Sequence, residues 1–198
     1  MAYLKEAEVR RAARADSRVI AKSMDSGSVL RESVLAAAST DEFDVFLCHS
    51  IRDAELVQGA KKILEDLGLK VYVDWIVDPQ MDRSSVTAET ARTLRDRMQK
   101  SRSLLYLFSN NSKRSRWMPW ELGYFDGRNG TVGVLPIAPD QGSLDFSQEE
   151  YLGLYPKVEL SNSTLFVNRT AGAPVSAEDK NNYRSFRAWV AGPEKLRL

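Results

Sequence analysis

The sequence predicts an α/β protein: a three-layer sandwich with a central parallel sheet of four or five strands, plus an N-terminal helical arm. Two observations lead to this class. Short apolar runs of strand length alternate with segments whose apolar residues recur at helical spacing. The runs are mostly apolar, as is typical of strands that are buried on both faces. Parallel strands need long crossover connections, so we expect helices on both faces of one sheet.

Residues 1–40 are rich in alanine and in charged residues and contain no proline. This composition predicts one or two helices, interrupted near DSGS at 25–28. We expect a solvated helical arm, with a self-association element as the alternative. We therefore divide the chain into an extension, 1–40, and a globular domain, 41–198.

The expected strands share a short apolar run that ends near polar or turn-forming residues. The last of them has the weakest pattern and is expected at an edge, after an irregular stretch over 138–157. The five runs are FDVFLC at 43–48, LKVYVD at 69–74, SLLYLFS at 103–109, TVGVLPI at 131–137 and KVEL at 157–160.

The expected helices lie between these strands and after them. The first follows residue 50 and stops at Gly68, a residue that favours helix ends. A serine pair at 84–85 is a candidate cap for a helix over 86–100. Pro119 suits the first turn of a third helix. The sequence SAED resembles a capping box and predicts a C-terminal helix over about 176–190, with Tyr183, Phe186 and Trp189 on one side.

Composition excludes several functional classes. The 198 residues carry a net charge of +1, so no basic field indicates nucleic acid. The single cysteine, Cys48, excludes an intrachain disulfide and fits a reducing compartment. We find no apolar run long enough for a membrane span and no secretory signal. The sequence therefore predicts a cytoplasmic protein with neither a nucleic-acid nor a membrane partner.

Several common chemistries lack their motifs. The chain has no GxxxxGK[ST] loop, no GxSxG elbow and no glycine fingerprint between a strand and a helix. One histidine and one cysteine cannot build a structural zinc site. We expect neither a metal ion nor a bound cofactor.

Polar residues follow the predicted strands at one edge of the sheet. Ligands of open parallel sheets bind beyond the carboxyl ends of the strands, where the strand order reverses. If the order is 2-1-3-4-5, residues 50–53 and 117–121 border that crevice, and the loop 75–85 could cover it as a lid. The candidate site residues are Ser50, Arg52, Asp53, Asp74, Trp75, Trp117 and Glu121.

Each candidate has a structural alternative. Asp53 could cap the first helix, and Asp74 could fix a turn. The tryptophans could pack in the core. His49 adjoins Ser50, but neighbours on a strand point to opposite faces, so we favour a packed histidine over a nucleophile–base pair. Glu121 could be a surface residue in a first helical turn, where the helix dipole favours an acid.

Three segments resemble the TIR (Toll/interleukin-1 receptor) domain family. FDVFLCHSIRD resembles its first box, and TVGVLPI resembles its fourth strand. SLLYLFSNNSKRSRWMPWELG resembles the third strand, the following loop and a helix with a Trp-x-x-x-Glu signature, here Trp117 to Glu121. The resemblance covers residues 42–160 and implies a flavodoxin-like fold.

Many TIR domains cleave NAD at the nicotinamide–ribose bond. The resemblance implies that Glu121 is the catalytic glutamate and that Ser50, Arg52 and Asp53 lie in a substrate-binding loop. The loop 75–85 corresponds to the family's lid-like loop, but VDPQMDR lacks the glycine of the animal signalling proteins.

A short chain of this kind resembles the prokaryotic antiphage proteins of the Thoeris type. The resemblance implies a cyclic ADP-ribose signal, a downstream effector that senses it, and self-association through TIR surfaces. NAD is then a substrate rather than a cofactor. The alternatives are a TIR interaction module without catalysis, and an enzyme similar to nucleoside deoxyribosyltransferases.

The chemistry accounts for a carboxylate among tryptophans. Loss of nicotinamide builds positive charge on the ribose carbon, as in glycoside hydrolysis. A negative charge at Glu121 would stabilise that cation most in a site from which water is excluded. We also expect Arg52 to bind the pyrophosphate and Trp75 to stack on a ring.

Overall fold

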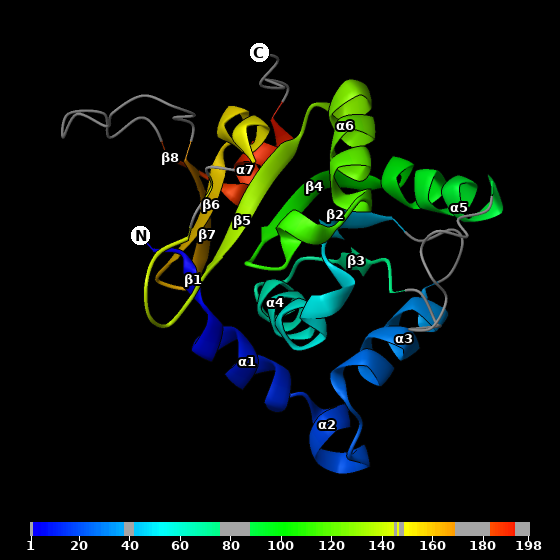
Figure 1. The fold of residues 1–198 in the computed structure, drawn as a ribbon, viewed down its shortest axis with the longest axis vertical. Helices are drawn as coiled ribbons and strands as arrows, with labels where there is room; N and C mark the ends of the chain where they lie inside the picture. Colours follow the sequence, from blue (N-terminus) through cyan, green and yellow to red (C-terminus); the bar gives the residue numbers. More distant parts are fainter. Residues whose placement is uncertain are drawn as a thin grey trace.

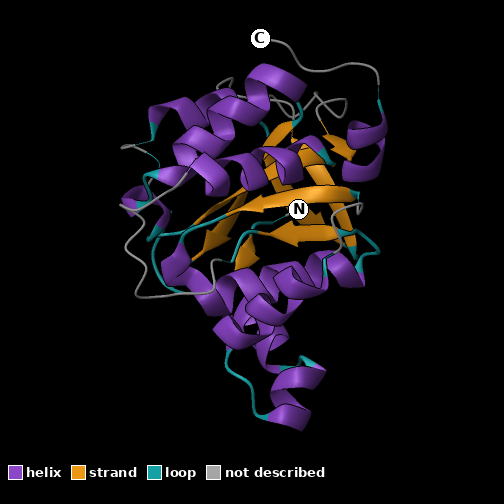
Figure 2. Cartoon of the chain, turned by 90° about the vertical axis from the view of Figure 1, so that its right-hand side faces the viewer, coloured by secondary structure: helices purple, strands orange, loops and turns teal. Residues whose placement is uncertain are grey.

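The computed structural model describes residues 2–37, 42–75, 88–144, 146, 149–168 and 183–192 (Figure 1). Its centre is an eight-stranded, mostly parallel sheet that lies between two layers of helices (Figure 2). The predicted three-layer α/β class is confirmed. In the described ranges, no helix is long and apolar enough to cross a membrane.

The parallel strands have the predicted order. That order reverses between β2 and β4, because β2 pairs with β3 on one side and with β4 on the other. The register places Val45 of β2 beside Val71 and Ser103. From one edge inward, the strands are β3 (Val71–Val73), β2 (Phe43–Cys48), β4 (Ser101–Phe108), β5 (Val132–Ala138) and β6 (Lys157–Ser161).

The prediction that KVEL forms an edge strand is wrong, because two antiparallel strands lie beyond it. β6 turns into β7 (Thr164–Asn168) through a two-residue hairpin, and β7 pairs with β8 (Tyr183–Ser185). Asn162 and Ser163, in the turn, have φ values of 47° and 56°. Positive φ at both positions matches the twist of the flanking strands, so it favours a hairpin here.

The C-terminal helix is shorter than expected. α7 (Phe186–Ala191) begins after β8, and the Ser185 hydroxyl accepts a hydrogen bond from the Ala188 amide. Tyr183 therefore belongs to a strand rather than to the helix, whereas Phe186 and Trp189 are buried as expected. The SAED sequence lies outside the described residues.

Each face of the sheet carries its own apolar core. α4 (Ala54–Asp66) and α7 pack on one face, and α5 (Ala88–Gln99) and α6 (Trp117–Asn129) pack on the other. β2 contributes Val45 and Leu47 to the first core and Phe46 and Cys48 to the second, as the alternation of a strand requires. Cys48 is a buried core residue.

The N-terminal segment is not a solvated arm. It forms β1 (Leu4–Lys5), α1 (Glu6–Arg14), α2 (Ser17–Lys22) and α3 (Ser26–Ala36). β1 joins the sheet beside β5, and α1 lies so close to α4 that a Cβ on Gly59 would come within 1.9 Å of the Val9 carbonyl oxygen. The expectation was wrong because a few apolar residues suffice to bury this segment. They are Leu4, Val9, Ala13, Val29 and Leu30.

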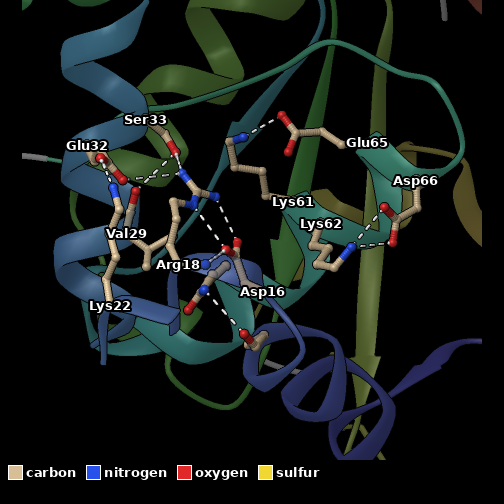
Figure 3. A network of polar contacts seen from close by, with 12 residues as sticks. Asp16, Arg18, Lys22, Val29, Glu32, Ser33, Lys61, Lys62, Glu65 and Asp66 are labelled. Carbon is tan, nitrogen blue, oxygen red and sulfur yellow. Dashed lines mark hydrogen bonds and ion pairs between the residues drawn. The ribbon is translucent and has the colours of Figure 1, made fainter. Parts of the chain in front are cut away.

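Polar contacts join α2 and α3 (Figure 3). Two nitrogens of the Arg18 guanidinium donate hydrogen bonds to the Asp16 carboxylate, at 2.7 and 3.0 Å, and a third donates to the Ser33 hydroxyl at 3.0 Å. These bonds from Arg18 lower the pKa of Asp16 to about 2. Lys22 forms an ion pair with Glu32.

Candidate functional site

The carboxyl edge of the sheet brings together two loops that are distant in the sequence. Residues 49–53 follow β2 and end in a short 3-10 helix, Ile51–Asp53. Residues 109–116 follow β4 and lead into α6, with a second 3-10 helix at Ser112–Arg114. Because β2 and β4 are neighbours at the reversal of strand order, these loops flank the position where the sequence predicts a crevice, and we call them its two walls. The second loop leads into residues 117–121, the other border that the sequence predicts.

Glu121 lies on α6 with 4% of its surface exposed, so it is not the solvated residue of the alternative interpretation. Its charge affects Tyr72, whose phenol has a raised pKa. Burial is the main cause of that rise, and the charges of Asp74 and Glu121 contribute to it. Asp74, directly after β3, and Glu121, on α6, therefore both act on the phenol of Tyr72, and the charge of Arg97 opposes their effect on its pKa.

Tryptophans accompany Glu121 on α6. Trp117 and Trp120 are half-buried and meet edge to face, with ring centroids 5.3 Å apart. Trp120 also stacks on Tyr124, and the guanidinium of Arg95 lies over its ring at 5.7 Å. Trp117, Trp120 and Glu121 thus share the first turns of α6, and Trp117 precedes the buried Glu121 by four residues, about one helical turn.

Trp75 follows β3 and is 6% exposed. Its indole stacks on the imidazole of His49 and is part of the apolar core. α3 lies against the same ring, because a Cβ on Gly27 would be 3.7 Å from the indole nitrogen. In this structure Trp75 is a packing residue, and its stacking on a substrate ring stays a prediction.

The loop after β2 holds the other predicted residues. Ser50 is buried, and its hydroxyl accepts a hydrogen bond from the Arg52 amide at 3.4 Å, whereas the Arg52 side chain is exposed. His49 is buried, and its Nδ1 lies 2.7 Å from the Leu47 carbonyl oxygen. The expectation of a packed histidine is confirmed.

Asp53 does not cap α4 with its side chain. Instead, the Ser109 hydroxyl donates to Asp53 Oδ2 at 2.5 Å, and the side-chain amide of Asn111 donates to Asp53 Oδ1 at 2.7 Å. Ser109 and Asn111 were not among the predicted site residues, although two polar side chains directly after the most apolar strand were a signal for them. The contact spans 56 residues to Ser109, which no local pattern reveals.

Arg97 of α5 is a third residue that the sequence did not indicate. Its guanidinium lies 5.3 Å from the centre of the Tyr72 ring, and it donates a hydrogen bond to the Ala37 carbonyl oxygen at 3.1 Å. It therefore links the end of the N-terminal segment to the tyrosine beside Asp74 and Glu121. Among the described residues, no group of three or more His, Cys, Asp or Glu side chains could hold a metal ion.

Comparisons with known proteins agree with this geometry. A family described as "TIR domain" matches residues 45–164. A protein of Bacillus cereus (strain MSX-D12), named "Probable 3' cyclic ADP-D-ribose synthase ThsB'", is 45% identical over 148 residues, which is 75% of each chain. A protein of Cytobacillus dafuensis, named "Putative cyclic ADP-D-ribose synthase TIR2", is 30% identical over 83 residues, which is 41% of this chain and 22% of that protein. The chain belongs to the TIR domain family.

Proposed function

We propose that this protein is a TIR enzyme that cleaves NAD at the nicotinamide–ribose bond and joins the ADP-ribose ends into a cyclic product. The observation that carries the proposal is the buried carboxylate of Glu121 on a helix that also presents Trp117. The similarity to a cyclic ADP-D-ribose synthase over three quarters of the chain supports the same reaction.

The chemistry requires charge stabilisation more than proton transfer. Nicotinamide leaves as a neutral molecule and takes the electron pair of the broken bond, so the ribose carbon becomes cationic. A carboxylate about 4 Å away, at an effective dielectric near 20, would stabilise that cation by roughly 4 kcal/mol, against about 1 kcal/mol in water. The difference explains why a buried acid is useful here. A nucleophile of the same molecule then closes the ring, whereas water would give linear ADP-ribose.

The other candidate residues have proposed roles in binding. The exposed guanidinium of Arg52 suits pyrophosphate oxygens, because its planar donors bind two oxygens at once. Trp117 offers a flat wall for a ring, and Ser50 and Asp74 lie at the ends of β2 and β3, where polar groups can reach ribose hydroxyls. We further propose that the protein is cytoplasmic, self-associates through TIR surfaces, and signals through its product to an effector.

The test is incubation of the purified protein with NAD, followed by chromatography of the products. It is run over a range of protein concentrations, because assembly could switch the enzyme on. We expect nicotinamide and a cyclic product from the wild type. Glu121→Gln should lower turnover by about three powers of ten, from the loss of roughly 4 kcal/mol. Glu159→Gln is the matched control, because Glu159 is also buried but lies on β6.

Three results would contradict the proposal. Full activity in Glu121→Gln would show that the reaction does not need the Glu121 carboxylate. Absence of NAD turnover at every concentration would favour the interaction module, and cleavage of a nucleoside in place of NAD would favour the deoxyribosyltransferase-like alternative.

A further inference from the structure

We infer that Asp53 is a positioning residue, which ties the two walls of the crevice together and thereby limits the access of water to the ribosyl cation. This inference rests on the proposed function, since it concerns the fate of that cation. It replaces the predicted substrate contact of Asp53 with a structural tie that controls the product.

The Asp53 carboxylate already accepts hydrogen bonds from protein side chains. It is 4% exposed, and its two oxygens accept hydrogen bonds from Ser109, at 2.5 Å, and Asn111, at 2.7 Å. Both donors come from the loop after β4, whereas Asp53 comes from the loop after β2. Hydrogen bonds to an ionised acceptor are stronger than those between neutral groups, so this contact resists separation of the loops.

Asp53 and its two hydrogen-bond partners are each held in place by further hydrogen bonds within their own loops. On one wall, the Asp53 amide donates to the Ser50 carbonyl oxygen at 3.0 Å. On the other wall, the Ser112 hydroxyl donates to the Ser109 carbonyl oxygen at 2.6 Å, and the backbone amide of Asn111 donates to the Ser109 hydroxyl oxygen at 3.1 Å. The contact therefore joins two ordered turns rather than two flexible side chains, and it sets the distance between them.

The Asp53 contact joins the two loops that carry or lead to the candidate site residues. One wall carries Ser50 and Arg52, and the other leads into α6 with Trp117 and Glu121. If the walls separate, the buried acid moves relative to the substrate loop, and water gains access to the cation. Ring closure and hydrolysis compete for the same carbon, so a wider crevice should favour linear ADP-ribose over the cyclic product.

The experiment compares Asp53→Asn, Ser109→Ala and the double variant with the wild type. Ser103→Ala is the control, because Ser103 is a buried serine of β4, the strand that precedes Ser109. Its hydroxyl donates a hydrogen bond to the Asp44 carbonyl oxygen, near the far end of that strand. Five quantities are measured: kcat and KM for NAD, the ratio of cyclic to linear product, the melting temperature, and amide hydrogen exchange of residues 50–53 and 109–112 without substrate.

We expect kcat to fall about tenfold in each single variant, with KM changed less than about twofold, because a small misplacement affects the reacting geometry more than the binding. The product ratio should shift about threefold or more toward linear ADP-ribose. The double variant should be no worse than the more impaired single variant, because both substitutions break one contact. Exchange should accelerate in both loops, and Ser103→Ala should change neither the ratio nor that exchange.

Other results would overturn the inference. If Asp53→Asn raises KM while Ser109→Ala does not, or if the two effects are additive, Asp53 contacts the substrate directly. A melting temperature that falls while the product ratio stays constant would indicate a merely structural residue. If the wild type does not cleave NAD, the proposed function fails separately. In that case, unchanged amide exchange of residues 50–53 and 109–112 in the variants would show that the Asp53 contact does not hold the loops together. If Asp53→Asn does not fold, this exchange is measured in Ser109→Ala.

Discussion

The indole of Trp75 lies parallel to the imidazole of His49, with ring centroids 5.6 Å apart and 12° between the planes. The contact joins the second residue after β3 to the residue after β2, and Gly27 of α3 lies near the same indole. Three parts of the chain therefore meet at one tryptophan.

Trp75→Ala should lower the free energy of unfolding by about 3 kcal/mol or more, because it leaves a cavity in a packed core. Trp75→Phe should lose much less, since it keeps an aromatic ring. Urea unfolding of both variants checks the prediction. A raised KM for NAD in Trp75→Ala without loss of stability would instead indicate the substrate stacking that the sequence suggested.

Gly59→Ala should be strongly destabilising, because the added methyl group would meet the Val9 carbonyl and force α1 away from α4. Gly127→Ala is a matched control within a helix, since nothing lies within 4 Å of a Cβ there. That variant should gain about 0.5–1 kcal/mol from helix propensity, equivalent to roughly 1–4 °C in Tm for a protein of this size. Equal melting temperatures for the two variants would contradict the close packing of α1.

Asp16→Asn should destabilise the protein in a pH-dependent way. The pKa of Asp16 falls from 3.8 to about 2 because Arg18 donates hydrogen bonds to its carboxylate. A lowered pKa contributes stability above pH 3.8, and this contribution is lost as the pH falls toward 2. The shift corresponds to about 2 kcal/mol at neutral pH.

The difference in unfolding free energy between wild type and Asp16→Asn, measured in urea at pH 7, 4 and 3, should therefore shrink below pH 4. Asp66→Asn removes an exposed ion pair with Lys62 and should cost about 0.5 kcal/mol or less. A wild-type advantage over Asp16→Asn that stays constant down to pH 3 would show that Arg18 does not hold the carboxylate.

Arg52→Ala should raise KM for NAD about tenfold with little change in Tm, because the side chain is exposed and its proposed partner is the pyrophosphate. Arg52→Lys should restore binding only in part, since an ammonium cannot bind two oxygens in one plane. Arg128→Ala, at an exposed position in the last turn of α6, is the control. If KM for NAD in Arg52→Ala stays at the wild-type value, a residue other than Arg52 binds the pyrophosphate.

The strand order could be predicted because it depends on local patterns. Val45 to Cys48 and Leu104 to Phe108 are continuous apolar runs, and the connections between such runs carry helical spacing. Once the order is known, the general geometry of open parallel sheets brings Ser50 and Glu121 to the same edge. These predictions needed no knowledge of individual side-chain contacts.

The remaining features depend on contacts that local sequence does not encode. Tyr183, Phe186 and Trp189 have helical spacing, yet Tyr183 pairs with Asn168 in a strand. β1 has only two residues, too few for any periodicity. The bond between Asp53 and Ser109 joins side chains whose types fit many loops, so tertiary structure alone selects them.

The pairing of Leu4 with Ile137, and of Ala2 with Leu160, has a consequence for biosynthesis. Residues 2–5 find these partners only after the ribosome has also made the segment that ends in β6. β1 therefore waits while β2 to β5 are synthesised, and a bulky insertion next to it would press against the strands that complete the sheet.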